Sequence, residues 1–201
     1  MAVELKKGQK ISLEKKSGAS LGEIIINLNW NQGEPRKGFL SALLKPKSID
    51  LDLGCLYELA DGTKGCVQAL GKAFGNYDGP PYIALDKDDR TGADAEGENL
   101  RINGGKIAQF KRILVYAFIY EGAANWQQAD GTVTVKYPGS EAVAVHLDEY
   151  GSLKSLCAIT LFENANNETF SVEKILQFFD DQSALDRAFG WGMRWSEGRK
   201  D

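Results

Sequence analysis

The chain has 201 residues, and 43% of them are hydrophobic, which is enough for one well-packed domain and excludes a disordered chain. Its 28 acidic against 24 basic residues give a formal net charge of −4. This acidic balance argues against phosphate-backbone binding, so we expect no nucleic-acid partner.

The first half of the chain alternates between apolar and polar residues, which predicts strands. One covers residues 24–30, where every second side chain is apolar. A second covers residues 49–57, where Asp50 and Asp52 share the face opposite the apolar one. Residues 71–99 are rich in Gly, Asp and Asn, and they predict a long loop of the kind that is either functional or disordered.

Strand patterns resume in the second half. Residues 100–102 alternate, residues 113–120 are apolar on both faces as in a central strand, and residues 132–137 and 141–147 form a predicted hairpin. Residues 155–163 predict another strand, and residues 169–172 a weaker one. The spacing then becomes helical and predicts two short helices, built on Val172, Ile175, Leu176 and Phe179 and on Leu185, Ala188 and Phe189.

Together these elements predict an all-β fold. We expect a two-sheet antiparallel β-sandwich with short C-terminal helices. The whole chain, 1–201, forms a single domain in this interpretation, and its C-terminal helical tail covers about residues 172–201.

The strongest chemical signal is the acidic segment 86–99, which holds six carboxylates against two basic residues. Such crowding is unfavourable unless water, salt or a bound cation relieves the repulsion. Calcium takes six to eight oxygen ligands in irregular geometry, and Gly92 and Gly97 would let the backbone fold around an ion. The segment is not an EF-hand, because Arg90 and Thr91 stand where that loop needs a ligand and a glycine.

Asp50 and Asp52 add a second acidic pair on a predicted strand. A loop that lies over their face would complete a coordination shell. The alternative is a solvated acidic loop beside a strand whose polar face is wet.

At these residues the sequence resembles the tellurium-resistance TerD-domain family. The resemblance covers roughly residues 3–180. Its matching segments are Leu5-Lys6-Lys7-Gly8 with Ile11-Ser12-Leu13, the strand 24–30 ending in Trp30, Ile49-Asp50-Leu51-Asp52, Asp88-Asp89-Arg90-Thr91-Gly92, and the strand 113–120 followed by Glu121. The tail 185–195 is most similar to the TerA branch.

This resemblance implies that the chain is a stress-response protein linked to tellurite resistance, with a calcium-binding β-sandwich fold. Carried over by position, the implied calcium ligands are Asp50, Asp52, Asp88, Asp89, Thr91, Gly92 and Glu98. The family binds two ions. Lys87 in place of a loop glycine and Asn99 in place of the terminal acid leave one site supported here. The resemblance also implies protein partners and a position at the inner face of the membrane.

Three alternatives remain open at this point. An adhesion- or carbohydrate-binding module would use the aromatic residues Phe74, Tyr77 and Tyr82, which otherwise pin the loop to the sandwich. A thiol-dependent detoxification enzyme would need an exposed cysteine of low pKa, for which Cys66 is the candidate and Cys55 is not. A third alternative is a TerD-like scaffold that has lost calcium.

The remaining polar residues favour a protein that is not an enzyme. His146 is the only histidine of the chain. A Ser-His-Asp or Cys-His hydrolase would have to use it as the general base, and we do not expect such an enzyme. The three cysteines lack C-x-x-C spacing, which argues against structural zinc. The N-terminus has no apolar signal segment and no apolar run approaches the roughly 20 residues of a membrane span, so we expect a cytoplasmic protein. Trp191 and Trp195 with nearby arginines predict either a docking tail or packing against the sandwich.

Overall fold

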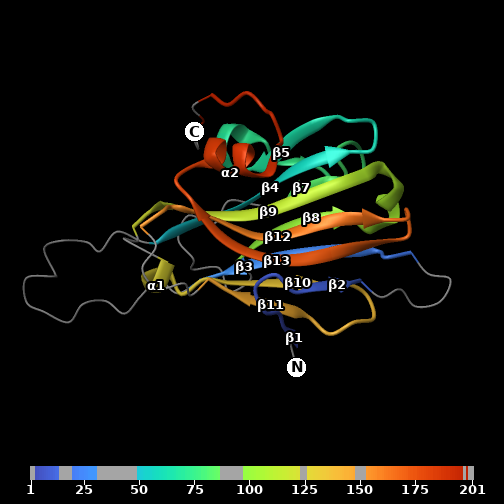
Figure 1. Ribbon diagram of the computed structural model, residues 1–201, viewed down its shortest axis with the longest axis horizontal. Coiled ribbons are helices and arrows are strands. Elements are labelled where there is room, and N and C mark those ends of the chain that lie inside the picture. Colours follow the sequence, from blue (N-terminus) through green and yellow to red (C-terminus); the bar gives the residue numbers. More distant parts are fainter. Residues whose placement is uncertain are drawn as a thin grey trace, which may run out of the picture.

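The structure, a computed structural model, describes residues 3–13, 20–30, 49–86, 97–122, 126–147, 153–196 and 198. Two β-sheets lie face to face in it (Figure 1). The seven-stranded sheet has the order β1 (Val3–Glu4), β11 (Val143–His146), β10 (Thr132–Lys136), β3 (Glu23–Asn29), β8 (Glu98–Asn103), β7 (Ile83–Leu85) and β6 (Gly75–Asn76).

The six-stranded sheet has the order β2 (Lys10–Ser12), β13 (Thr169–Phe179), β12 (Leu156–Ala165), β9 (Phe110–Glu121), β4 (Asp50–Leu59) and β5 (Lys64–Gln68). Neighbouring strands are antiparallel in both sheets, except that β1 and β11 run parallel. The helical elements are η1 (Leu70–Lys72), η2 (Gly104–Gln109), α1 (Trp126–Ala129) and α2 (Gln182–Phe189). The predicted all-β sandwich with short helices is therefore confirmed.

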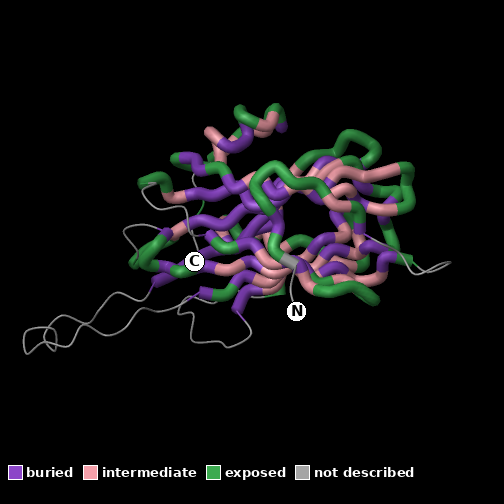
Figure 2. The backbone as a smooth tube through the Cα atoms, turned by 60° about the horizontal axis from the view of Figure 1, so that its bottom comes forward, coloured by how far each residue is buried: buried purple, intermediate pink, exposed green. Residues whose placement is uncertain are grey.

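The main core contains residues of both sheets, and the strands carry many of the residues that are coloured as buried in Figure 2. The predicted period is confirmed in β3, where Ile24, Ile26 and Leu28 are fully buried. β9 is the central strand that the sequence predicts, since it pairs with β12 on one side and β4 on the other and is apolar on both faces.

A second apolar cluster covers the outer face of the six-stranded sheet, and we call it the outer cluster. Its buried members come from four strands of that sheet, from α2 and from the residue after its C-cap: Leu56, Leu114, Tyr116, Phe118, Leu156, Ala158, Phe179, Leu185 and Trp191. The six-stranded sheet is consequently buried on both faces. Within the described ranges no helix is both long and apolar enough to cross a bilayer.

The helix predicted on Val172, Ile175, Leu176 and Phe179 is wrong, because these residues belong to strand β13. Phe170, Val172 and Lys174 alternate inward, and the register with β12 then shifts between Ala158 and Thr160. The shift coincides with a positive φ of 49° at Leu176. Apolar side chains on both faces of a bulged strand imitate helical spacing. The second predicted helix is confirmed as α2, capped by Asp181 and ended by Gly190 in the left-handed region.

The long loop predicted over residues 71–99 is only partly correct. The segment contains part of η1, both β6 and β7, and the start of β8 at Glu98. Short strands at the edge of a sheet have too few residues to show a clear alternation.

Candidate metal centre

The acids of β4 are buried, which rules out the wet polar face considered above. Asp50 is 2% exposed and Asp52 is 0% exposed. β4 lies between β9 and β5, with Leu51 and Leu53 in the main core and Leu56 in the outer cluster. The strand therefore carries two carboxylates into a region that excludes water from both faces.

Glu98 brings a third buried carboxylate to the same strand from the opposite sheet. It opens β8 and is 0% exposed. Its Oε2 atom accepts the backbone N–H of Leu53 at 2.7 Å, so it is bonded to the residue directly after Asp52. Gly97 fixes the approach to this position, because it has a φ of 60° and a Cβ there would collide with the carbonyl oxygen of Leu28.

The structure thus places three of the seven predicted ligands, and brings Glu98 to the β4 segment that carries the other two. The remaining four, Asp88, Asp89, Thr91 and Gly92, lie outside the described residues. Among the residues that are described, no three His, Cys, Asp or Glu side chains are placed to hold a metal ion. The strands alone therefore supply part of a donor set, and any further ligands must come from elsewhere.

This partial donor set fits a hard cation. All three side chains are carboxylates, and oxygen ligands are those that calcium prefers. Burying a carboxylate is costly unless donors or a cation stabilise it. The chemistry of the site and its burial are both consistent with calcium.

The aromatic residues of the 71–99 segment pack inward. Phe74 and Tyr82 lie against the main core, and the Tyr82 ring meets Phe110 edge-on at 6.4 Å between centroids. Tyr77 is half-buried, and its carbonyl oxygen accepts a hydrogen bond from the Asn103 side chain at 3.2 Å. Two of the three aromatic residues are therefore used to hold the segment on the sandwich, which weakens the carbohydrate alternative.

The cysteines do not fit a reactive-thiol site. Cys55 and Cys157 are fully buried and Cys66 is half-buried. Burial raises the pKa of the Cys55 thiol and of the Cys66 thiol. A nucleophilic thiol needs the opposite shift, since the thiolate is the reactive form.

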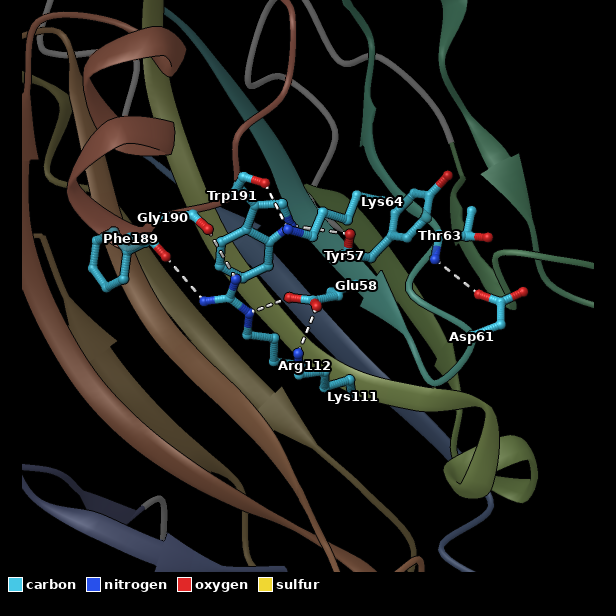
Figure 3. Close-up of polar contacts among 10 residues, drawn as sticks. All are labelled: Tyr57, Glu58, Asp61, Thr63, Lys64, Lys111, Arg112, Phe189, Gly190 and Trp191. Carbon is cyan, nitrogen blue, oxygen red and sulfur yellow. Dashed lines mark hydrogen bonds and ion pairs between the residues drawn. The ribbon is translucent and has the colours of Figure 1, made fainter.

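The sequence did not reveal a charged cluster on the outer face of the six-stranded sheet (Figure 3). Glu58 on β4 accepts hydrogen bonds from Lys111 Nζ and from Arg112 Nε on β9, both at 2.7 Å. The Arg112 guanidinium also lies 3.7 Å from the centre of a Trp191 ring. These partners are more than 50 positions apart in sequence, so no local spacing could have revealed them.

Trp191 packs against the sandwich and is only 1% exposed, so the docking-tail alternative is wrong for this residue. Its Nε1 donates to the carbonyl oxygen of Tyr57 at 3.0 Å, and its own carbonyl oxygen accepts from Lys64 Nζ at 2.8 Å. His146 is exposed, as expected of a strand residue on the polar face, and its ring contacts the Thr132 hydroxyl.

Comparison with known proteins gives a consistent family. The TerD domain model matches residues 1–137. A tellurium resistance protein TerA of Alcaligenes sp. is 48% identical over 191 residues, which cover 94% of this chain and 56% of that protein. A tellurium resistance protein TerX of Serratia marcescens is 30% identical over 142 residues, covering 61% of this chain and 64% of that protein. The chain therefore spans less than two thirds of the length of these relatives.

Two crystal structures share the fold. One is a homologue of the telluride resistance protein TerD from Streptomyces coelicolor A3(2), with a TM-score of 0.59, 17% identity and coverage of 83% of this chain and 95% of that one. The other is a protein of unknown function, with a TM-score of 0.60, 15% identity and coverage of 88% and 100%. At these identities the likeness establishes the fold alone.

Proposed function

Because this chain belongs to the TerD-domain family, we propose that it serves in tellurite resistance as a non-enzymatic, calcium-binding stress-response protein. Its relatives named as tellurium resistance proteins support the resistance role. Its location in this proposal is the cytoplasm, at the inner face of the membrane. Its partners are other proteins, including stress-response members of the same family.

The observation that carries the calcium proposal is the burial of Asp50, Asp52 and Glu98 at one end of β4 and β8. These side chains would supply carboxylate oxygens from the strands. The segment that leads into Gly97 would supply the rest, from Asp88, Asp89, Thr91 and Gly92. Bound calcium would offset the repulsion among these acids and order the surface that partners recognise.

Glu98 has a second role in this arrangement. Its hydrogen bond to Leu53 joins the two sheets next to Asp52. It thereby holds the β4 acids at a fixed position relative to Gly97. Oxygen ligands fixed on rigid strands lose little entropy when an ion binds, which favours affinity.

The test is a calorimetric calcium titration of the chelator-treated protein. We expect saturable binding in the wild type and its loss in Asp50→Asn/Asp52→Asn. The control is Asp61→Asn/Asp78→Asn, which removes the same two charges from exposed positions and should bind like the wild type. Thermal melting gives a second measurement, because an ion that binds only the folded state raises the melting temperature.

The opposite result has a clear meaning. No heat and an unchanged melting temperature in millimolar calcium would show that this chain is a TerD-like scaffold without calcium. Equal calcium binding by both double variants would show that the ion binds at a site that does not include Asp50 and Asp52.

A further inference from the structure

Residues 190–196 follow α2 and lie on the outer cluster; we call them the C-terminal strap. One carboxylate accepts three of their N–H groups. Asp186, itself 4% exposed, accepts the backbone N–H groups of Gly192 and Met193 at 2.7 and 2.9 Å and the indole Nε1–H of Trp195 at 2.9 Å. Trp191 is the apolar anchor, fixed between Tyr57, Lys64 and Arg112 (Figure 3).

The route of the strap crosses β5. At its start the carbonyl oxygen of Trp191 meets Lys64, the first residue of β5. Just beyond its end, Gly198 lies against Leu70 and Gly71, which follow β5. Cys66 sits on the strand between these two points and belongs to the outer cluster, as do Met193 and Trp195 of the strap. The strap therefore runs over the part of β5 that carries this half-buried thiol.

The strap can open without leaving buried charges unpaired. Beyond Trp191 its residues are half-buried or exposed, and Gly190 and Gly192 have φ values of 63° and 75° that suit hinge positions. Asp186 would gain water in place of the strap donors. Arg112 would keep its bonds to Glu58 and to the carbonyl oxygen of Phe189. Local opening of this kind costs less than global unfolding.

We propose that residues 190–196 are a reversible strap, latched by Asp186 and anchored by Trp191, whose opening uncovers the β5 side of the outer cluster together with Cys66. The sandwich stays folded during this motion, because the main core between the sheets contains no strap residue. Access of solutes to the Cys66 thiol is then set by the latch and not by the stability of the fold.

The test measures alkylation of each cysteine by iodoacetamide, in which the thiolate sulfur displaces iodide, with peptide mapping by mass spectrometry. The main variant is Asp186→Asn. Its amide nitrogen cannot accept a hydrogen bond, so at least one strap N–H group loses its acceptor. We expect Cys66 to react roughly tenfold faster or more, since charge-assisted hydrogen bonds are lost. Cys55 and Cys157 should keep their wild-type alkylation rates because they belong to the main core between the sheets.

A milder variant and a matched control complete the series. Trp195→Phe removes one latch donor at a half-exposed position, and it should speed the Cys66 reaction by a smaller factor. Asp61→Asn also removes one acid near β5, but Asp61 accepts the backbone N–H of Thr63 in the turn and is exposed, so its rate should equal the wild type. Hydrogen exchange at Gly192 and Met193 should speed up in Asp186→Asn.

Two results would overturn the proposal. One is an unchanged Cys66 rate in both latch variants while their melting remains cooperative. The other is a parallel rise at all three cysteines, which would mean that the whole sandwich opens and that the strap has no motion of its own.

Discussion

Replacing Glu58 by glutamine should lower the unfolding free energy at pH 7. It should also make that free energy less sensitive to acidic pH. The Glu58 side chain is 6% exposed and pairs with Lys111 and Arg112. Lys111 is 62% exposed and recovers its hydration easily, so its pair contributes little. Arg112 is 21% exposed and holds Trp191 as well, so its pair carries most of the effect.

The magnitude follows from this asymmetry. Removing the carboxylate from one partly buried, charge-assisted bond costs about 2 kcal/mol of unfolding free energy. In a chain of this size, that loss lowers the melting temperature by roughly 4–8 °C. Glu163→Gln is the control, because Glu163 is 47% exposed and its ion pair with Lys10 is at the surface. It should change the unfolding free energy by less than about 0.5 kcal/mol.

The pH dependence gives a second, independent readout. Burial pushes the pKa of Glu58 upward, but the hydrogen bonds and charges of Lys111 and Arg112 outweigh it, and the pKa is lowered from its ordinary value of 4.5. A lowered pKa in the folded state stabilises the protein above the unfolded pKa, and this stabilisation is lost as the pH falls through the folded pKa. The gap between wild type and Glu58→Gln should therefore be full at pH 7 and shrink below about pH 4.5.

Circular dichroism melts from pH 7 to pH 3 measure both effects. Equal melting temperatures at pH 7 would show that the pairs contribute nothing. A gap that stays constant into acid would show that glutamine acts through packing and not through the lost charge.

Three further changes test single contacts by chemical denaturation. The Thr160 hydroxyl is buried without a hydrogen-bond partner in the described part of the chain, so Thr160→Val should raise the unfolding free energy by about 1 kcal/mol, and a lower value would contradict this. Gly97→Ala should lower it by about 2 kcal/mol or more, because the new Cβ meets the Leu28 carbonyl oxygen at a positive φ; wild-type stability would refute the assigned backbone. Tyr116→Phe should lower it by about 1–2 kcal/mol, since the 2.6 Å bond to Gln68 is lost in a buried site; no change would mean that water replaces the hydroxyl.

Much of the fold follows from local patterns in the sequence. Strands β3 and β9 were predictable because a half-buried strand alternates and a strand buried on both faces is continuously apolar. The second helix was predictable from the local spacing of Leu185, Ala188 and Phe189, whereas its caps, Asp181 and Gly190, come from the structure. The prediction was wrong for β13 because the irregularity in its pairing interrupts the alternation by which strands are recognised.

The candidate site was predictable in its residue types and not in its surroundings. Asp50 and Asp52 are visible as acids on one strand face, but their burial depends on what covers that face. Strand spacing carries no information about that cover, because the sheet neighbours of β4 and the outer cluster come from distant parts of the chain. The link from Glu98 to Leu53 crosses between sheets, and no spacing rule connects the two residues.

The buried acids Asp186 and Asp52 have different surroundings, so the burial of each needs its own explanation. Asp186 is buried because three N–H groups of its own C-terminal strap converge on it, so its charge is stabilised within the chain. Asp52 lies on β4, near the Tyr116 phenol, whose pKa is raised by burial first and by the Cys66, Cys55 and Asp52 charges after it. For Asp52 and its neighbour Asp50 the proposed stabilising charge is a cation. Calcium removal should therefore destabilise the β4 end of the sandwich and leave the strap latched, so hydrogen exchange can separate the two sites in one protein.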